Sequence, residues 1–297
     1  MGSGSYDYSS RSIRAQSAGY STKSTHEIFE SRSINVAMSP LGVDIRESRD
    51  SAEHPNSYPI IIALDVTGSM GSVPHYLVKE GLPNIMKAIM EKGIEDPQIL
   101  FVAVGDHEYD KAPLQVGQFE SSDELLDHWL TKVYLEGGGG GNGGESYMLA
   151  HYFAIYHTAT DSLAKRGKKG VLITIGDELN LRSISGSTVK SIMGTGKEYK
   201  NSYTSSELIS QARESWEVYH LHTNGRTTQS GIDVASDWRE LIGDGLIVEH
   251  DKSKIAKVIA DVVIKEFNKN ASYQVINNFG EVKEQINIQE NVGNIIL

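Results

Sequence analysis

The sequence predicts an α/β fold, with a doubly wound, mainly parallel sheet of about six strands flanked by helices. Two observations predict it. From Pro59 onward, short apolar segments typical of buried strands alternate with segments whose apolar residues recur at helical spacing. Acidic and hydroxyl residues directly follow several of the apolar segments, at the sheet edge where parallel α/β folds place their ligands. This form is Rossmann-like.

Six apolar segments supply the expected strands. Each is a short run rich in Val, Ile, Leu or Phe and is bounded by polar or glycine residues, as strands buried on both faces are. Five are expected to run parallel and the segment 114–119 antiparallel; the parallel ones are 60–65, 99–105, 171–176, 218–223 and 246–250.

Helices are expected between these strands. In the segment 81–92, Leu82, Ile85, Met86 and Ile89 recur at the spacing of one helix face. The same periodicity marks 253–267. Further helices are expected at 122–132, 145–157 and 206–216, and the connection 180–204 predicts an excursion that contains a helix.

Composition limits the possible functions. The chain has 297 residues, with 28 Lys and Arg against 39 Asp and Glu, which gives a net charge of −11. Such an acidic protein is not expected to bind nucleic acid or an anionic membrane, because both require a basic surface. The chain contains no cysteine, which excludes disulfides and thiolate metal sites. Any metal must therefore use oxygen or imidazole ligands.

The chain divides into four parts by its patterning. Residues 1–33 lack apolar periodicity and are expected to be a disordered arm, or a docking arm that uses its Tyr and Arg residues. Residues 34–56 form a linker with a possible edge strand. Residues 57–270 carry the α/β domain, and 271–297 form a C-terminal extension that could add a strand, a packing tail or an assembly contact.

The first residues carry no apolar stretch behind a basic end, so they do not predict a secretory signal. No apolar run approaches the roughly 18 residues of a membrane span. A cytoplasmic location is therefore expected.

The segment PIIIALDVTGSMGS carries the most specific chemistry. An apolar strand ends in Asp65, and Thr67 and Ser69 follow in a turn that contains Gly68 and Gly71. One carboxylate and two hydroxyls in a tight loop present oxygen atoms to one point, as a small hard cation requires. The alternative is an ordinary turn that caps the following helix.

These residues resemble the metal-ion-dependent adhesion site of von Willebrand factor type A domains, whose pattern is Asp-x-Ser-x-Ser, with Thr67 in place of the first serine. The resemblance covers roughly residues 57–270. The version found here looks most like bacterial type A domains and those of alpha-kinase proteins. It implies direct hydroxyl ligation by Thr67 and Ser69, and a direct or water-mediated contact by Asp65.

The resemblance extends to two further loops. In the family, the strand that corresponds to 171–176 supplies a second acidic group, and Asp177 matches that position. The family also supplies a threonine from a glycine-rich loop, where this chain has Gly141. Asn142 is therefore expected to contact the metal, and Glu145 to cap the next helix or to accept a hydrogen bond from bound water.

The segment that follows 99–105 is expected to form the rim of the same site. It carries Asp106, His107, Glu108 and Asp110. His107 would titrate near neutral pH, although a rim histidine is more often a surface hydrogen-bonding group than a metal ligand.

The function implied by the resemblance is divalent-cation-dependent protein binding, without catalysis. The expected ion is Mg²⁺ or Mn²⁺, with Ca²⁺ fitting less well, and a partner's Asp or Glu would complete its shell. The protein would be an adaptor or assembly component. An AAA+ ATPase is a partner by analogy with the family and rests on no residue of this chain.

Two other functions remain open from the sequence. A metal-dependent hydrolase would need a general base, for which His107, Glu108, Glu145 or Glu178 could serve. A self-assembling structural protein would use the N-terminal arm and the asparagine-rich C-terminal segment to contact other copies of the chain.

Overall fold

The computed structural model describes residues 4–136, 142–194, 199–224 and 231–272. Its central sheet has six strands in the order β12-β11-β7-β2-β3-β4, all parallel except β4, which pairs antiparallel with β3. The predicted α/β fold and all six predicted strands are confirmed. They are β2 (Tyr58–Asp65), β3 (Pro97–Val104), β4 (Leu114–Glu120), β7 (Gly170–Gly176), β11 (Trp216–His222) and β12 (Leu246–Val248).

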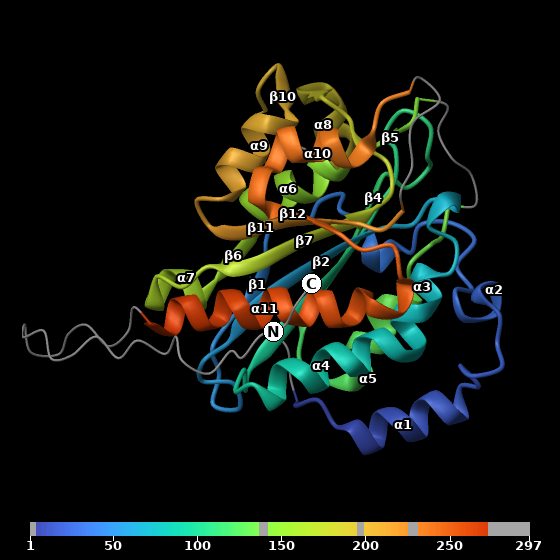
Figure 1. Cartoon of the computed structure of the whole chain (residues 1–297), viewed down its shortest axis with the longest axis vertical. Helices are drawn as coiled ribbons and strands as arrows, with labels where there is room; N and C mark the ends of the chain where they lie inside the picture. The colour runs from blue at the N-terminus through green and yellow to red at the C-terminus, as the bar shows by residue number, and fades with distance from the viewer. Residues whose placement is uncertain (1–3, 137–141, 195–198, 225–230, 273–297) are drawn as a thin grey trace, which may run out of the picture.

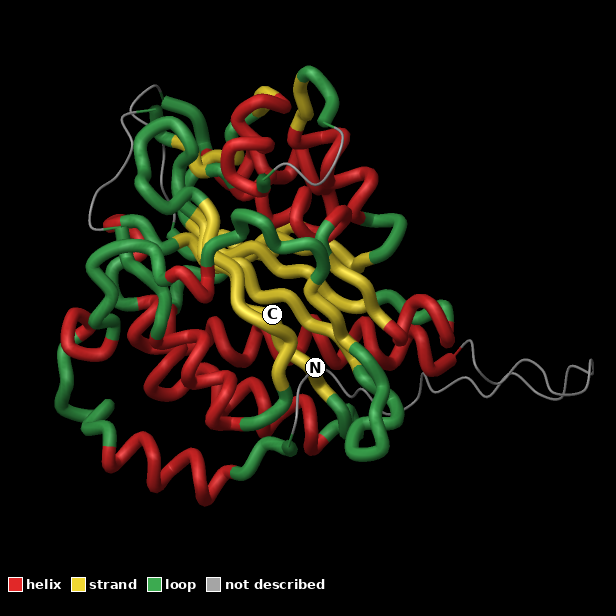
Figure 2. Tube along the Cα trace, turned by 180° about the vertical axis from the view of Figure 1, so that it is seen from behind, coloured by secondary structure: helices red, strands yellow, loops and turns green. Residues whose placement is uncertain are grey.

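Helices cover both faces of this sheet (Figures 1 and 2). All residues of β2, β3 and β7 are buried, which is why these strands are continuously apolar rather than alternating. One face carries α1 (Tyr8–Ser17), α3 (Val73–Tyr76), η3 (Leu77–Gly81), α4 (Leu82–Glu91), α5 (Asp123–Thr131) and α11 (Ile255–Ser272). The other carries α6 (Tyr147–Tyr156), α8 (Gly186–Met193), α9 (Ser205–Ala212) and α10 (Val234–Ile242).

Five of the helices lie where the sequence predicts them, with ends that differ by a few residues. Polar side chains mark two of the starts. The Ser122 hydroxyl accepts a hydrogen bond from the Leu125 amide at the start of α5, and Thr204 accepts one from the Glu207 amide at the start of α9. Each cap satisfies an amide that has no partner within the first turn.

Short helices and strands make up much of the rest of the described chain. The segment 180–204 contains α8, which confirms the predicted helix-containing excursion. The other short elements are η1 (Val36–Met38), η2 (Gly68–Met70), η4 (Gly243–Gly245), η5 (Lys252–Lys254), α2 (Thr25–Ile28), α7 (Asp161–Arg166), and the strand pairs β1 (Arg46–Ser48) with β6 (Thr158–Thr160), β5 (Gly144–Glu145) with β8 (Leu179–Asn180), and β9 (Ser183–Ser185) with β10 (Ser202–Thr204).

Two segments outside the domain differ from the sequence-based expectation. Within 34–56, the strand β1 pairs with β6 and forms no edge of the central sheet. Residues 4–33, expected as a disordered or docking arm, fold into α1 and α2 and lie against the domain's own helices. Residues 273–297, most of the predicted C-terminal extension, lie outside the described residues.

Isolated anchors hold residues 4–33 in place. The side chains of Ile28 and Phe29 are 6% and 2% exposed and belong to the core beneath α4. Arg11, 2% exposed, forms a 2.9 Å ion pair with Asp127 of α5. These anchors are separate contacts rather than a periodic apolar face, which explains why the apolar pattern did not reveal them.

Within the described ranges, no helix combines the length and the apolarity needed to cross a bilayer.

The strand order places the candidate site. The chain runs outward from β2 to β3 and β4 on one side, and from β7 to β11 and β12 on the other. The carboxyl ends of β2 and β7 therefore flank the point where the winding direction reverses, which is where open parallel sheets bind ligands. Asp65 ends β2 and Asp177 directly follows β7.

We predict that Phe29→Ala lowers the free energy of unfolding by about 3 kcal/mol, because it opens a cavity in the core. Ile13→Ala, on the exposed side of α1 at 65% exposure, should change it by less than about 0.5 kcal/mol. Urea denaturation measures both values. Equal, small effects would show that residues 4–33 contribute no stability.

Candidate metal centre

Asp65 lies completely buried at the end of β2. Its Oδ1 accepts hydrogen bonds from the Thr67 amide at 2.8 Å and from the Thr67 hydroxyl at 2.6 Å. The hydrogen bond from the Thr67 amide back to the Asp65 side chain closes a short ring, which shapes the turn after the strand. Gly71 closes the turn at a φ of 52°, a conformation that glycine adopts without steric cost.

Ser69 connects this loop to the second acidic residue. Its hydroxyl donates to Asp177 Oδ1 at 2.7 Å, and its oxygen lies 3.3 Å from the Thr67 hydroxyl oxygen. The structure thus brings together Asp65, Thr67, Ser69 and Asp177, the four residues that the sequence placed on two separate loops.

The protons of the two hydroxyls are committed to the carboxylates. Thr67 donates to Asp65, and Ser69 donates to Asp177. A hydroxyl has a single proton, so with both protons directed to the carboxylates the lone pairs of the two oxygens, 3.3 Å apart, are available to a cation.

This donor set fits a hard divalent cation. Neighbouring oxygens of an octahedral shell lie about 3.0 Å apart for Mg²⁺ and about 3.4 Å apart for Ca²⁺, given metal–oxygen distances of about 2.1 and 2.4 Å. The 3.3 Å between the Thr67 and Ser69 oxygens falls within that range. Among the described residues, no group of three or more His, Cys, Asp or Glu side chains is arranged to hold a metal. A site here would therefore need the hydroxyls.

Tyr147 holds the other oxygen of Asp65. Its buried hydroxyl donates to Asp65 Oδ2 at 2.9 Å, from the first turn of α6. A Cβ at Gly176 would lie 1.7 Å from that hydroxyl oxygen, so the glycine makes room for the tyrosine. We did not predict this contact, although the glycine directly before Asp177 was a signal for it.

Trp238 supports the Asp177 loop from behind. Its indole nitrogen donates to the Glu178 carbonyl at 2.9 Å, and its ring stacks on His220 at 3.6 Å between centroids. The Tyr147 ring meets Trp238 edge to face at 5.4 Å. One aromatic cluster therefore positions both acidic loops.

The rim residues form a separate hydrogen-bonded group. The Asn142 amide nitrogen donates to Asp106 Oδ2 at 2.8 Å and to Glu108 Oε2 at 3.0 Å, while its oxygen accepts from the Gly144 amide. Asn142 is thus tied to the Asp106 side in this structure, and its role as a metal ligand stays a prediction. Gly141, in the place of the family's threonine, lies outside the described residues.

His107 is held by the start of α6. Its backbone amide donates to the Ser146 hydroxyl oxygen at 2.9 Å, and its Nδ1 lies 2.7 Å from the same oxygen. The histidine therefore joins the rim loop to the helix that carries Tyr147.

Glu145 is a buried acidic group beside the site. It is 2% exposed, and its Oε2 has no hydrogen-bond partner. Burial raises the pKa of Glu145 to about 10, and the nearby carboxylates of Asp65 and Asp110 add to the rise. The raised pKa favours the neutral form of Glu145, and the sequence-based role as helix cap or water ligand stays a prediction.

Burial also raises the pKa of Asp65 to about 7, and the negative charge of Asp177 contributes to the rise, whereas the Thr67 hydrogen bonds oppose it. An ionised Asp65 next to Asp177 is thus costly in the protein alone. A bound cation would remove this cost.

No family model and no curated protein matches the sequence. Among solved structures, the open conformation of the pilus adhesin SpaC from Lactobacillus rhamnosus GG matches with a TM-score of 0.50 and 12% identity, over 73% of this chain and 31% of the adhesin. This chain thus spans about a third of the adhesin's length.

Two other solved structures match with lower scores. An aerotolerance-related membrane protein from Bacteroides fragilis has a TM-score of 0.40 and 14% identity, over 71% of this chain and 99% of that one. Proximal thread matrix protein 1 from the mussel byssus has a TM-score of 0.42 and 13% identity, over 71% and 46%.

At such identities the adhesin match shows the fold alone. The strand order and the mixed α/β layers are consistent with the von Willebrand type A and Rossmann-like fold.

We predict that Asp65→Asn makes the chelator-treated protein more stable at pH 8. The folded-state pKa of Asp65 lies above the ordinary 3.8, so this group's stabilisation is complete below about pH 4 and is lost as the pH rises through 7. Asparagine cannot ionise and avoids that loss. Thermal unfolding between pH 4 and 8 should show a flatter profile for the variant.

Glu145→Gln is the matched control, because the raised pKa favours the neutral form of Glu145 at pH 8. It should leave the unfolding midpoint at that pH nearly unchanged. An Asp65→Asn variant less stable than wild type at pH 8 would contradict the prediction.

Proposed function

We propose that this protein is a divalent-cation-dependent protein-binding module. The observation that carries the proposal is the pair of hydroxyl oxygens of Thr67 and Ser69, 3.3 Å apart, whose protons are both directed to buried carboxylates. Hydroxyl and carboxylate oxygens are ligands of hard divalent cations, and the ion we propose is Mg²⁺ or Mn²⁺. Thr67, Ser69, Asp65 and Asp177 would hold the ion.

The bound ion supplies a local positive charge at the edge of an acidic protein. That charge makes a carboxylate of a partner the fitting group, because protein oxygens from only two loops leave the ion's shell incomplete. The partner we propose is therefore a protein that presents Asp or Glu. The adhesin SpaC, which shares the fold, is by its name an adhesion protein.

Binding rather than catalysis is proposed because three of the four groups that could act as a base are otherwise engaged. Burial raises the pKa of Glu145 and favours its protonated form. His107 Nδ1 contacts the Ser146 hydroxyl, and Glu108 accepts a hydrogen bond from Asn142. No observation specifically favours the hydrolase or the self-assembling protein.

Calorimetric titration of Mg²⁺ and Mn²⁺ into chelator-treated protein tests the site. We expect binding by the wild type and a loss of at least tenfold in affinity for Thr67→Val combined with Ser69→Ala, which removes both hydroxyl ligands. The matched control is Thr188→Val with Ser191→Ala on α8, the same chemistry far from the site along the chain. Equal affinities of both double variants would refute the site.

Selection of displayed peptides on the protein tests the partner. In Mg²⁺, we expect enrichment of sequences with Asp or Glu, because the ion's open position takes a carboxylate. Their binding should disappear with EDTA and on replacement of that residue by Asn or Gln. Enrichment of neutral, EDTA-insensitive peptides would argue against a metal-bridged partner.

A further inference from the structure

We call residues 66–70, which follow β2 and carry Thr67 and Ser69, the metal loop. The N-terminal segment, residues 4–33, lies along the helices that follow this loop (Figure 1). Its backbone contacts both short elements there. The His75 Nε2 of α3 is 3.1 Å from the Lys23 carbonyl oxygen, and the Lys79 ammonium of η3 donates to the Ser21 carbonyl at 3.2 Å. The segment therefore contacts the chain only a few residues beyond Ser69.

η3 is a π-helical turn between α3 and α4. In this turn the Leu82 amide donates to the Leu77 carbonyl, five residues back, rather than to Val78. The next amide in the same register would belong to Pro83, which has no N–H. The Val78 carbonyl therefore receives no hydrogen bond from the amide four residues on, at Leu82, or from position 83 five residues on, where proline has no N–H.

Arg11 of α1 supplies the missing donor. Its Nη2 donates to the buried Val78 carbonyl at 2.5 Å, and its Nε pairs with Asp127 of α5 at 2.9 Å. The Tyr20 ring lies 5.4 Å from the guanidinium carbon. A buried carbonyl without a donor costs about 1–3 kcal/mol, so η3 in this form depends on Arg11.

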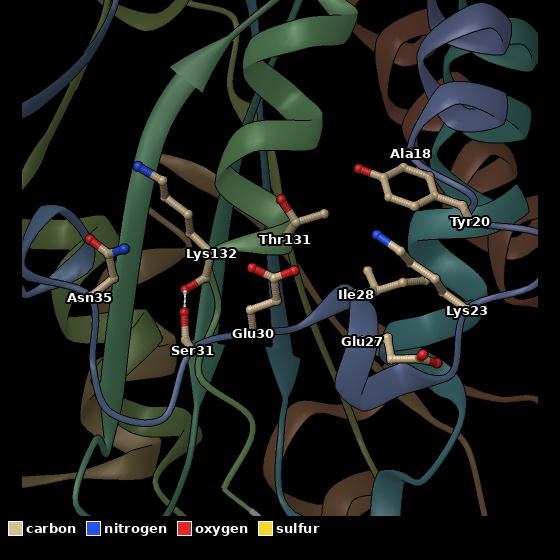
Figure 3. Close-up of a pocket in the computed structure, with 10 residues that line it drawn as sticks. All are labelled: Ala18, Tyr20, Lys23, Glu27, Ile28, Glu30, Ser31, Asn35, Thr131 and Lys132. Atoms are coloured by element: carbon tan, nitrogen blue, oxygen red, sulfur yellow. Dashed lines mark hydrogen bonds between the residues drawn. The ribbon is translucent and has the colours of Figure 1, made fainter.

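Another part of the segment lines an open cavity. This cavity, of about 480 Å³, separates that part from the end of α5. Figure 3 shows Tyr20 and Lys23 on one side of this cavity and Thr131 on the other, with the hydrogen bond from Ser31 to the Lys132 carbonyl on the Thr131 side. Arg11 is therefore one of several attachments of the segment, together with Ile28 and Phe29 in the core.

The metal loop joins α3 through Gly71 and Ser72 alone. Met70 of the loop, Val73 of α3 and Val78 of η3 are buried in one apolar cluster. π-helical turns inside helices are frequent at functional sites. A change in η3 can thus be transmitted to Ser69 through packed neighbours.

We propose that the N-terminal segment is a conformational clamp, in which Arg11 holds the π-turn η3 and thereby keeps the metal loop ready to bind a cation. This inference rests on the proposed function. Detachment of α1 from α5 and η3 would therefore lower the affinity of the metal site for the cation.

The test compares Arg11→Met with Arg14→Met in the full chain. Arg14→Met breaks the α1–α5 ion pair with Asp123 but leaves the Arg11–Val78 bond in place. We expect Arg11→Met to lower Mg²⁺ affinity at least fivefold, the lower range of coupling between distinct sites, and Arg14→Met to leave it within twofold. Titrations are made well below both unfolding midpoints. Equal affinities would overturn the clamp.

Hydrogen exchange tests the clamp independently of metal binding. In chelator-treated protein, Arg11→Met should speed exchange of amides in 66–82, and Arg14→Met should not. If the wild type binds no cation, the proposed function fails while this result still shows whether the segment holds the loop. Unchanged exchange together with intact Mg²⁺ binding would refute the clamp alone.

A rescue variant distinguishes the bond from general destabilisation. Pro83→Ala restores an amide that can donate to the Val78 carbonyl. Added to Arg11→Met, it should recover slow exchange in 66–82 and at least part of the lost affinity. Failure to recover either one would show that the Arg11–Val78 bond is not what holds the turn.

Discussion

The burial of Asp65 at the reversal point of the sheet is the constraint on which the rest of the site depends. A carboxylate there must be protonated, hydrogen-bonded or paired with a cation. Thr67 and Tyr147 supply hydrogen bonds from two different elements. Asp177 brings a second negative charge to the same place. The loops around these groups are shaped to make such a concentration of charge tolerable, and a cation would complete that arrangement.

The sequence predicted most of the sheet, because strands buried on both faces leave an unmistakable apolar run between polar ends. The resemblance to type A domains also implied that Asp65 and Asp177 lie near each other, and the structure brings them together through Ser69. The N-terminal segment escaped prediction because Arg11 and Phe29 are isolated anchors. Apolar periodicity in a sequence indicates a continuous buried face. A segment that is held by a few separate side chains has no such face.

Within the site, what the sequence could not supply was the direction of each side chain. Asn142 stands where the resemblance placed a ligand, yet its amide is bonded to Asp106 and Glu108. Tyr147 was part of a predicted helix, but only the packing shows that its hydroxyl reaches Asp65. Long and amide side chains have several rotamers, and tertiary contacts select among them.

The contact between Gly176 and Tyr147 has an evolutionary consequence. A Cβ at position 176 would fall almost on the tyrosine hydroxyl, so the two positions are not free to drift independently. A side chain at position 176 requires Tyr147 to move or to be replaced by a shorter residue, and either change gives up the bond to Asp65. Any such substitution therefore passes through a state in which the buried acid has lost one of its partners.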